Sequence, residues 1–281
     1  MEKMKKTLDW DVLTAPVHVN SNKLSDRVAI VRSDTGETLS LRSGKYCPFK
    51  NTDLKQLIAR VIRKTNYELI GYQEFRKGRR VIAYLKLNQE NLPKGSRKLS
   101  IGDSATNDYL LIGNAHDGSS SLFIAFTNLL LRCENQFTMP IRIFGMEHRK
   151  RISLDGQAID NLLYSFHRER NKVYELMTGW MKLEVSKQLI DRFINHMFPA
   201  GTMENIAEEI MLKRTRLKKS IQREIGDLGS NYWGLFNGVT HFSTPRSGTS
   251  LFGNPYSQGN NLNAKAIRFL KQESKRVWKT Q

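Results

Sequence analysis

The chain has 281 residues, of which 45 are lysine or arginine and 27 are aspartate or glutamate, so its formal net charge is +18. A hydrophobic fraction of 39% and an aromatic fraction of 9% are typical of a folded protein and exclude a disordered basic tail. Such a basic surface repels itself unless a polyanion or an acidic partner neutralises it, which favours nucleic acid over an anionic membrane surface. The alternative is a folded protein with a solvated basic surface.

Cysteine content and hydropathy indicate the cellular compartment of the protein. Cys47 and Cys133 are the only cysteines, which excludes a disulfide framework and a zinc finger built from Cys-x-x-Cys pairs. No segment approaches the ~18 consecutive apolar residues of a membrane span, and the N-terminus lacks the apolar core of a signal peptide. We therefore expect a soluble protein of a reducing, cytoplasmic compartment, with no membrane contact.

The N-terminal half is predicted to be mainly β-structure. Residues 1–45 alternate short apolar runs with turn residues, which indicates a strand or two with loops. A polar cap then precedes apolar residues at helical spacing, so a short amphipathic helix is expected over residues 51–64. Residues 67–75 and 80–87 alternate with a period of two around Lys77-Gly78, which predicts a β-hairpin with a basic tip.

Two further strands are predicted over residues 109–115 and 122–127, separated by the turn His116-Asp117-Gly118-Ser119. Together with the hairpin they indicate an antiparallel meander of four or more strands.

Beyond residue 150 the apolar residues recur at helical spacing. From 159 to 197 the pattern predicts one very long helix or two, which Pro199-Ala200-Gly201 end. A strongly basic helix is expected from Met203 to about Ile225, followed by an apolar-aromatic element over 230–242. Residues 243–263 favour a flexible loop before a last basic amphipathic helix.

The predicted fold class is therefore α+β, with an N-terminal antiparallel β-meander that includes a short helix and a C-terminal half of long helices. We expect a mixed domain over residues 1–150, a helical region over 151–242 packed on it, and a flexible loop with a basic helix over 243–281.

The His116-Asp117-Gly118 turn is the first candidate for chemistry, because a histidine and an aspartate held together can act as acid, base or metal ligand. An Asp-Gly pair between two apolar runs is also a standard hairpin turn signal. The pattern favours the structural role and leaves a nucleic-acid contact or catalysis as alternatives.

Other sites of chemistry have little support. Cys133 is a candidate nucleophile only if a histidine lies beside it in space, and a buried small residue is the simpler interpretation. The chain has no Gly-x-x-x-x-Gly-Lys-Ser/Thr loop, no Gly-x-Gly-x-x-Gly turn after a strand and no His-Glu-x-x-His helix. Its carboxylates are scattered rather than grouped as a two-metal nuclease needs. We expect no catalytic residue, no metal and no cofactor.

Aromatic residues beside basic ones are candidates for base stacking. Tyr72, Phe75 and Tyr84 alternate with basic residues on the predicted hairpin, and Trp233 lies in the apolar-aromatic element. The helical spacing of Trp233 with Phe236 and Thr240 also fits a core-facing stripe, which is the favoured role for Trp233.

Four segments together resemble the phage/plasmid-like protein family, the domain of unknown function 932. They are the Gly-Lys-Tyr-x-Pro stretch from Gly44 to Pro48, the His-Asp-Gly turn, Arg132-Cys133 with Asn135, and the Trp-Gly-Leu-Phe-Asn-Gly-Val-Thr run from Trp233 to Thr240. The resemblance covers residues 44–242 and implies a phage, plasmid or other mobile-element origin in a bacterial cell. It implies no mechanism, and Asn135 is expected to be structural, like the His-Asp-Gly turn.

In outline, a basic protein with a meander followed by helices is similar to the phage single-strand annealing proteins, which form rings or filaments. That similarity implies an ATP-independent, homo-oligomeric protein that binds and anneals single-stranded DNA in recombination or replication, with duplex DNA and RNA left open as ligands. The alternatives are a metal-dependent nuclease and a phage-encoded protein that binds and inhibits a host protein.

The predicted contacts to the nucleic-acid backbone are lysines and arginines that cluster at three places in the chain. They are Arg76, Lys77, Arg79, Arg80, Arg149, Lys150, Arg151, Lys213, Arg214, Arg216, Lys218 and Lys219.

Overall fold

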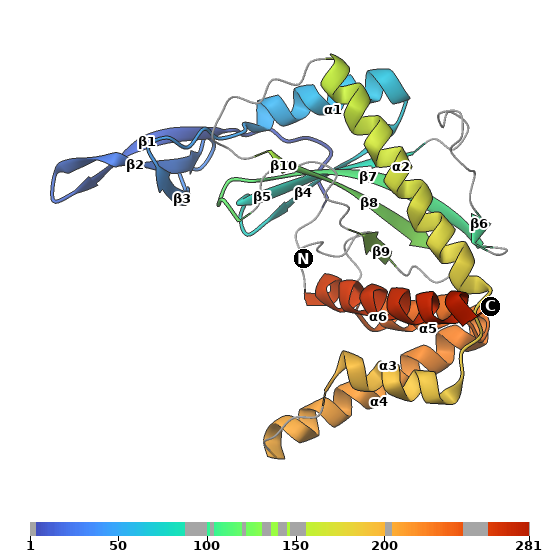
Figure 1. Ribbon diagram of the computed structural model, residues 1–281. Helices are drawn as coiled ribbons and strands as arrows, with labels where there is room; N and C mark the ends of the chain where they lie inside the picture. Colours follow the sequence, from blue (N-terminus) through green and yellow to red (C-terminus); the bar gives the residue numbers. More distant parts are fainter. Residues whose placement is uncertain are drawn as a thin grey trace.

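A computed structural model describes residues 4–87, 100–101, 104–119, 122–130, 136–139, 145–146, 156–199, 204–243 and 258–280 (Figure 1). Antiparallel strands dominate the N-terminal half and helices form the C-terminal half, which confirms the predicted α+β class.

The larger sheet is an antiparallel meander flanked by short strands. Its hydrogen-bonded order is β10-β8-β7-β5-β4, with β9 paired to β8 and β6 paired to β7. The bounds are β4 Glu68–Phe75, β5 Arg80–Lys86, β6 Ser100–Ile101, β7 Ser104–Ala115, β8 Leu122–Leu130, β9 Gln136–Met139 and β10 Gly145–Met146. The predicted hairpin and meander are therefore confirmed, because β4 pairs with β5, β5 with β7, and β7 with β8.

Both faces of this sheet bury side chains. Val81 and Ala83 of β5 belong to the main core, whereas Tyr84 belongs to a second apolar cluster on the opposite face, since successive residues of a strand point to opposite sides. Two helices, α1 (Asn51–Thr65) and α2 (Gly156–Met181), lie over the first face (Figure 1).

The predicted short helix is α1, and a residue from outside it caps its N-terminus. The Asp11 carboxylate accepts hydrogen bonds from the backbone N–H of Asn51 at 2.8 Å and from the hydroxyl of Thr52 at 2.5 Å. A carboxylate at this position satisfies unpaired backbone donors and favours the helix dipole.

A second, three-stranded antiparallel sheet has the order β1-β2-β3, with β1 Val12–Val19, β2 Asn22–Arg32 and β3 Thr38–Ser43. It is one strand more than the strand or two that the sequence predicts. The β1 and β2 strands continue as a ribbon that reaches away from the rest of the chain (Figure 1). Its tip is a two-residue turn in which Asn20 and Ser21 have φ values of 46° and 64°.

The predicted long helical pattern proves to be two helices, α2 and α3 (Lys187–Met197). Ser186 starts the second helix, because its hydroxyl accepts from the backbone N–H of Leu189 at 3.1 Å. The chain continues with α4 (Glu204–Leu228), α5 (Tyr232–Ser243) and α6 (Gln258–Thr280), and α5 contacts both α4 and α6. None of the helices in the described part of the chain is long and apolar enough to cross a membrane.

One boundary differs from the prediction. The Gly- and Asn-rich residues 258–263 were expected in a loop but form the first turns of α6. Asn263 is buried there, and its side-chain oxygen accepts from the Ser243 hydroxyl at 3.1 Å. Packing against α5 therefore overrides the weak helix propensity of these residues.

Candidate nucleic-acid interface

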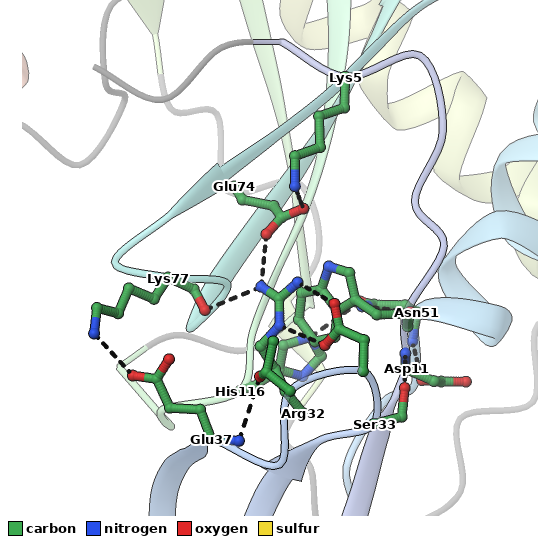
Figure 2. Close-up of polar contacts among 12 residues, drawn as sticks. Lys5, Asp11, Arg32, Ser33, Glu37, Asn51, Glu74, Lys77 and His116 are labelled. Atoms are coloured by element: carbon green, nitrogen blue, oxygen red, sulfur yellow. Dashed lines mark hydrogen bonds and ion pairs between the residues drawn. The ribbon is translucent and has the colours of Figure 1, made fainter.

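His116, the first residue of the His-Asp-Gly turn, is buried against the start of α1, whereas Gly118 is exposed (Figure 2). His116 Nε2 lies 3.0 Å from Oδ1 of Asn51, and Nδ2 of Asn114 donates to the carbonyl of Phe49 at 2.7 Å. His116, Asn51 and Asn114 are fully buried. These contacts join the β7–β8 turn to Phe49 and Asn51, which follow the Gly-Lys-Tyr-Cys-Pro stretch. Their role is therefore structural.

Asp117 and Gly118 complete the turn. An Asp117 carboxylate oxygen accepts from the backbone N–H of Ser119 at 3.0 Å, and the carboxylate lies 3.6 Å from Nε of Arg80. Partial burial alone would raise the pKa of Asp117, but the bonds from Ser119 and the charges of Arg80 and Arg42 outweigh it and lower the pKa. Gly118 has φ +65°, and an added Cβ would lie 2.5 Å from the Arg42 guanidinium carbon.

The β4–β5 turn is held from below by a buried arginine (Figure 2). The Arg32 guanidinium donates to Glu74 at 2.7 Å, to both carboxylate oxygens of Asp34 at 2.8 Å and to the carbonyl of Lys77 at 3.1 Å. It also lies 3.9 Å from the centre of the Trp10 ring. This network joins the hairpin turn to the small sheet. It also neutralises the charges of Glu74 and Asp34 with a cation of the same protein.

The predicted cations of the hairpin tip have two different roles. Arg80 donates to the Ser119 hydroxyl at 2.9 Å, and Lys77 Nζ lies 3.3 Å from a Glu37 carboxylate oxygen, so both have partners within the protein. Arg76 and Arg79 are exposed and contact no carboxylate among the described residues. Arg76 and Arg79 are thus the tip residues with the least charge compensation in the described chain, and the phosphate contacts of all four tip residues stay a prediction.

Burial contradicts base stacking by the three predicted hairpin aromatics, and it agrees with the core position favoured for Trp233. Tyr72, Phe75, Tyr84 and Trp233 are only 5%, 7%, 0% and 2% exposed. Tyr84 donates its hydroxyl to the equally buried Gln73 at 3.0 Å. The stacking prediction for the hairpin is wrong because both faces of its strands are covered, so Tyr72, Phe75 and Tyr84 fill the core rather than the surface.

The Trp-Gly-Leu-Phe-Asn-Gly segment is a helix-packing motif in α5. A Cβ added to Gly234 would lie 2.5 Å from the Gly229 carbonyl oxygen, and one added to Gly238 would lie 2.6 Å from Cα of Ile221. The two glycines are four residues apart and so face α4 together, where they let the two backbones approach closely. Asn237 donates to the Trp233 carbonyl at 2.9 Å.

The predicted cations of α4 also fall into two groups, those bonded within the protein and those exposed to solvent. Arg214 donates from Nε to the carbonyl of Phe198 at 2.8 Å, just past the end of α3, and Lys213 pairs with Glu209 at 2.5 Å. The other three are exposed and contact no carboxylate in the described part of the chain: Arg216, Lys218 and Lys219.

Beyond Lys213, which pairs with Glu209, α4 holds no aspartate or glutamate from residue 214 to residue 223. The nearest carboxylate, Glu224, points into the protein, where it is fully buried and lies 2.6 Å from Nδ1 of His241. Arg223 adds a further exposed cation one turn beyond Lys219. The helix therefore presents a basic strip to solvent, as the sequence predicts.

A second basic strip lies on α6 and was not among the predicted contacts. Arg268, Lys271 and Lys275 are exposed at steps of three and four residues, so they follow one side of the helix. Glu273, the one carboxylate of α6, is largely buried and pairs with Arg192 and with Arg276. Mapping the basic cluster at residues 271–276 onto a helical period would have found this strip.

The two basic helices meet at the C-terminal end of α3. Lys265 of α6 donates to the carbonyl of Met197 at 2.9 Å, beside the bond that Arg214 of α4 makes to the next carbonyl. His196 lies there too, and burial, followed by the charges of Lys265 and Arg268, lowers its pKa. Like charges gathered in this way favour an anion nearby. The main contacts of the β4–β5 hairpin are within the large sheet, and Figure 1 shows it well apart from α4.

A buried polar cluster between β7 and α2 was not predicted. Asp108 pairs with Nε of Arg170 at 2.7 Å and accepts from the hydroxyl of Tyr174, and all three residues are almost fully buried. The Tyr67 hydroxyl lies 2.8 Å from Nε2 of His167. Burial, and then the Arg170 charge, lower the pKa of His167 to about 4. The cluster fixes α2 on the sheet and is closed to a macromolecular ligand.

Several predicted residues lie outside the described ones: Arg132, Cys133, Asn135, Arg149, Lys150 and Arg151. Within the described ranges, no group of three or more His, Cys, Asp and Glu side chains is placed to hold a metal ion. The nuclease alternative therefore gains no support from that part of the chain.

The family model described as Domain of unknown function (DUF932) matches residues 38–264. No curated protein and no solved structure matches the chain. The match contains the His-Asp-Gly turn, the Arg132 to Asn135 segment and the Gly234/Gly238 packing motif, and it covers well over half of the sequence. The chain therefore belongs to the DUF932 family.

Proposed function

We propose that this protein binds single-stranded DNA through the basic strips of α4 and α6 and anneals complementary strands without ATP, as a phage- or plasmid-borne recombination or replication protein acting as a homo-oligomer. The proposal rests on one observation: the carboxylates nearest the basic surfaces are paired with arginines or buried. Asp34, Glu74 and Asp117 pair with buried or half-buried arginines, and Glu224 and Glu273 are drawn inward on the two basic helices. Exposed cations of α4 and α6 are left without a carboxylate contact among the described residues, namely Arg216, Lys218, Lys219, Arg223, Arg268, Lys271 and Lys275.

Electrostatics supports a ligand that is long and uniformly negative. Exposed cations that contact no carboxylate in the described chain stand at successive turns of α4 and α6, which matches a repeating phosphate backbone better than a single small anion. Phosphate contacts carry no sequence information, so the binding is expected to be sequence-tolerant.

Fluorescence anisotropy with a labelled oligonucleotide tests the binding. If ~6 phosphates are neutralised, log affinity plotted against log salt should fall with a slope of about −4. Annealing is followed as the pairing of two complementary oligonucleotides with EDTA present and no nucleotide added, while gel filtration follows assembly. A flat salt response would remove the electrostatic basis of the proposal.

The same experiments separate the alternatives. Strand cleavage that appears with magnesium and disappears with EDTA would support the nuclease. No retention of DNA at about 0.1 M salt, where exposed charges still act over ~10 Å, would favour a protein that binds and inhibits a host protein.

A further inference from the structure

We infer that Trp278, at the end of α6, stacks on an unpaired base of a single strand whose phosphates lie along Arg268, Lys271 and Lys275. The inference rests on the proposed function, because it assigns the base-contacting residue of the same basic surface. It replaces the stacking residues predicted from the sequence, which are buried.

Trp278 differs from the other tryptophans in its exposure. Trp10, Trp180 and Trp233 are 5%, 1% and 2% exposed, whereas Trp278 is 46% exposed. An indole offers a large flat apolar surface that usually finds a partner. Trp278 leaves about half of that surface to solvent in a protein that buries its other three indoles.

The indole is also held in place. A Cβ added to Gly179, near the end of α2, would lie 3.1 Å from Cζ2 of Trp278, so the ring is seated where α2 lacks a side chain. Figure 1 shows the C-terminal end of α6 beside this end of α2. A ring fixed in this way loses little conformational entropy when a base stacks on it.

The basic strip leads directly to this ring. Arg268, Lys271, Lys275 and Trp278 follow one another at steps of three, four and three residues, so they share one side of α6 over roughly 15 Å. The buried Glu273 lies on the other side with its two arginine partners. Cations in line with an aromatic platform are the arrangement that single-strand binding requires.

A basic helix with a terminal tryptophan also suits an anionic membrane surface, but the packing of α6 disfavours it. Its apolar residues Ala266, Ile267 and Leu270 are buried in the core. An interfacial helix needs that apolar face free to enter the lipid. The exposed side of α6 offers one indole and several charges, which suits a nucleic-acid strand.

The test compares the full-length protein with two variants, Trp278→Leu and Trp278→Phe, against two ligands of about 20 nucleotides: an oligothymidylate and an abasic oligomer of the same length. The abasic oligomer keeps the phosphates and lacks the bases. We expect the wild type to bind oligothymidylate roughly 5- to 100-fold more tightly than the abasic oligomer. Trp278→Leu should lose most of this preference with its salt slope unchanged, and Trp278→Phe should retain much of it.

A complementary variant, Lys271→Gln, should make the salt slope less negative by about 0.7 while the preference for bases stays. Tyr164→Ala and Lys23→Gln remove an exposed aromatic and an exposed lysine elsewhere, and should change neither quantity. Oligothymidylate should also quench the tryptophan fluorescence of the wild type and not that of Trp278→Leu.

The outcomes are distinct. If the wild type binds neither oligomer, the proposed function fails. If it binds both equally, or if Trp278→Leu keeps the preference for bases, the stacking role is overturned while DNA binding stands. If anionic vesicles shift the emission of Trp278 and neither oligomer does, α6 contacts lipid and the inference is wrong.

Discussion

Gly238 of α5 lies directly against Ile221 of α4, where an added Cβ would approach the Ile221 Cα to 2.6 Å. The neighbour at this distance is backbone, which cannot move aside as the end of a side chain can. The crossing of α4 and α5 thus depends on this glycine, and α5 in turn contacts α6, which carries the second basic strip.

Replacing Gly238 by alanine should destabilise the protein by about 1–3 kcal/mol, because the helices must move apart or distort. Gly226 of α4 is the matched control, since nothing lies within 4 Å of a Cβ added there. Gly226→Ala should raise the stability by roughly 0.5–1 kcal/mol, as alanine favours the helix. Urea unfolding of both variants measures the difference, and equal effects would show that the close approach has no energetic role.

For the His-Asp-Gly turn, Asp117→Ala should lower stability by ~1 kcal/mol, because the Ser119 N–H loses its acceptor and Arg80 loses its ion-pair partner. DNA binding should fall only in proportion to unfolding. The midpoint of thermal unfolding and anisotropy on the same sample check this. An unchanged midpoint with abolished DNA binding would instead identify the turn as a contact site.

His167 should make stability depend on pH in a defined window. Its pKa in the folded protein is lowered to about 4, below the ~6.5 of an unfolded chain, so the unfolded state binds more protons between these values. The free energy of unfolding should therefore fall, by up to roughly 3 kcal/mol from this residue, as the pH drops from about 6.5 to about 4.

Urea unfolding at several pH values, compared between the wild type and His167→Gln, isolates this contribution, because the other titrating groups are common to both proteins. The variant should lose less stability across the window. If both proteins share one pH profile, His167 does not titrate as its burial implies.

On α4, substituting glutamine for Arg216, Lys219 or Arg223 should weaken binding to all oligonucleotide sequences alike. Each change should make the salt slope less negative by about 0.7, since each removes one phosphate contact. Arg214→Gln is the contrasting variant, because its bond to the Phe198 carbonyl holds α4 to α3. It should lower the free energy of unfolding, whereas the three exposed substitutions should leave that free energy within about 0.5 kcal/mol of the wild type.

Local patterns in the sequence determined most of the elements. A period of two on either side of Lys77-Gly78 predicted β4 and β5, and helical spacing with a stop at Pro199 predicted the end of α3. The basic character of α4 was equally visible, because charge is a property of the residues themselves. The local pattern gave the wrong start for α6. Gly259 and Asn260 disfavour a helix, but packing of α6 against α5 stabilises it there.

Only the tertiary structure decided which aromatic and which cation reaches solvent. Tyr84 and Trp278 each follow basic residues in the sequence, yet one is fully buried and the other is about half exposed. Arg214 and Arg216 stand two residues apart, yet one caps α3 and the other is exposed without a carboxylate contact in the described chain. A periodic pattern fixes which residues share a face. Whether another element covers that face depends on contacts between distant segments, which no local pattern records.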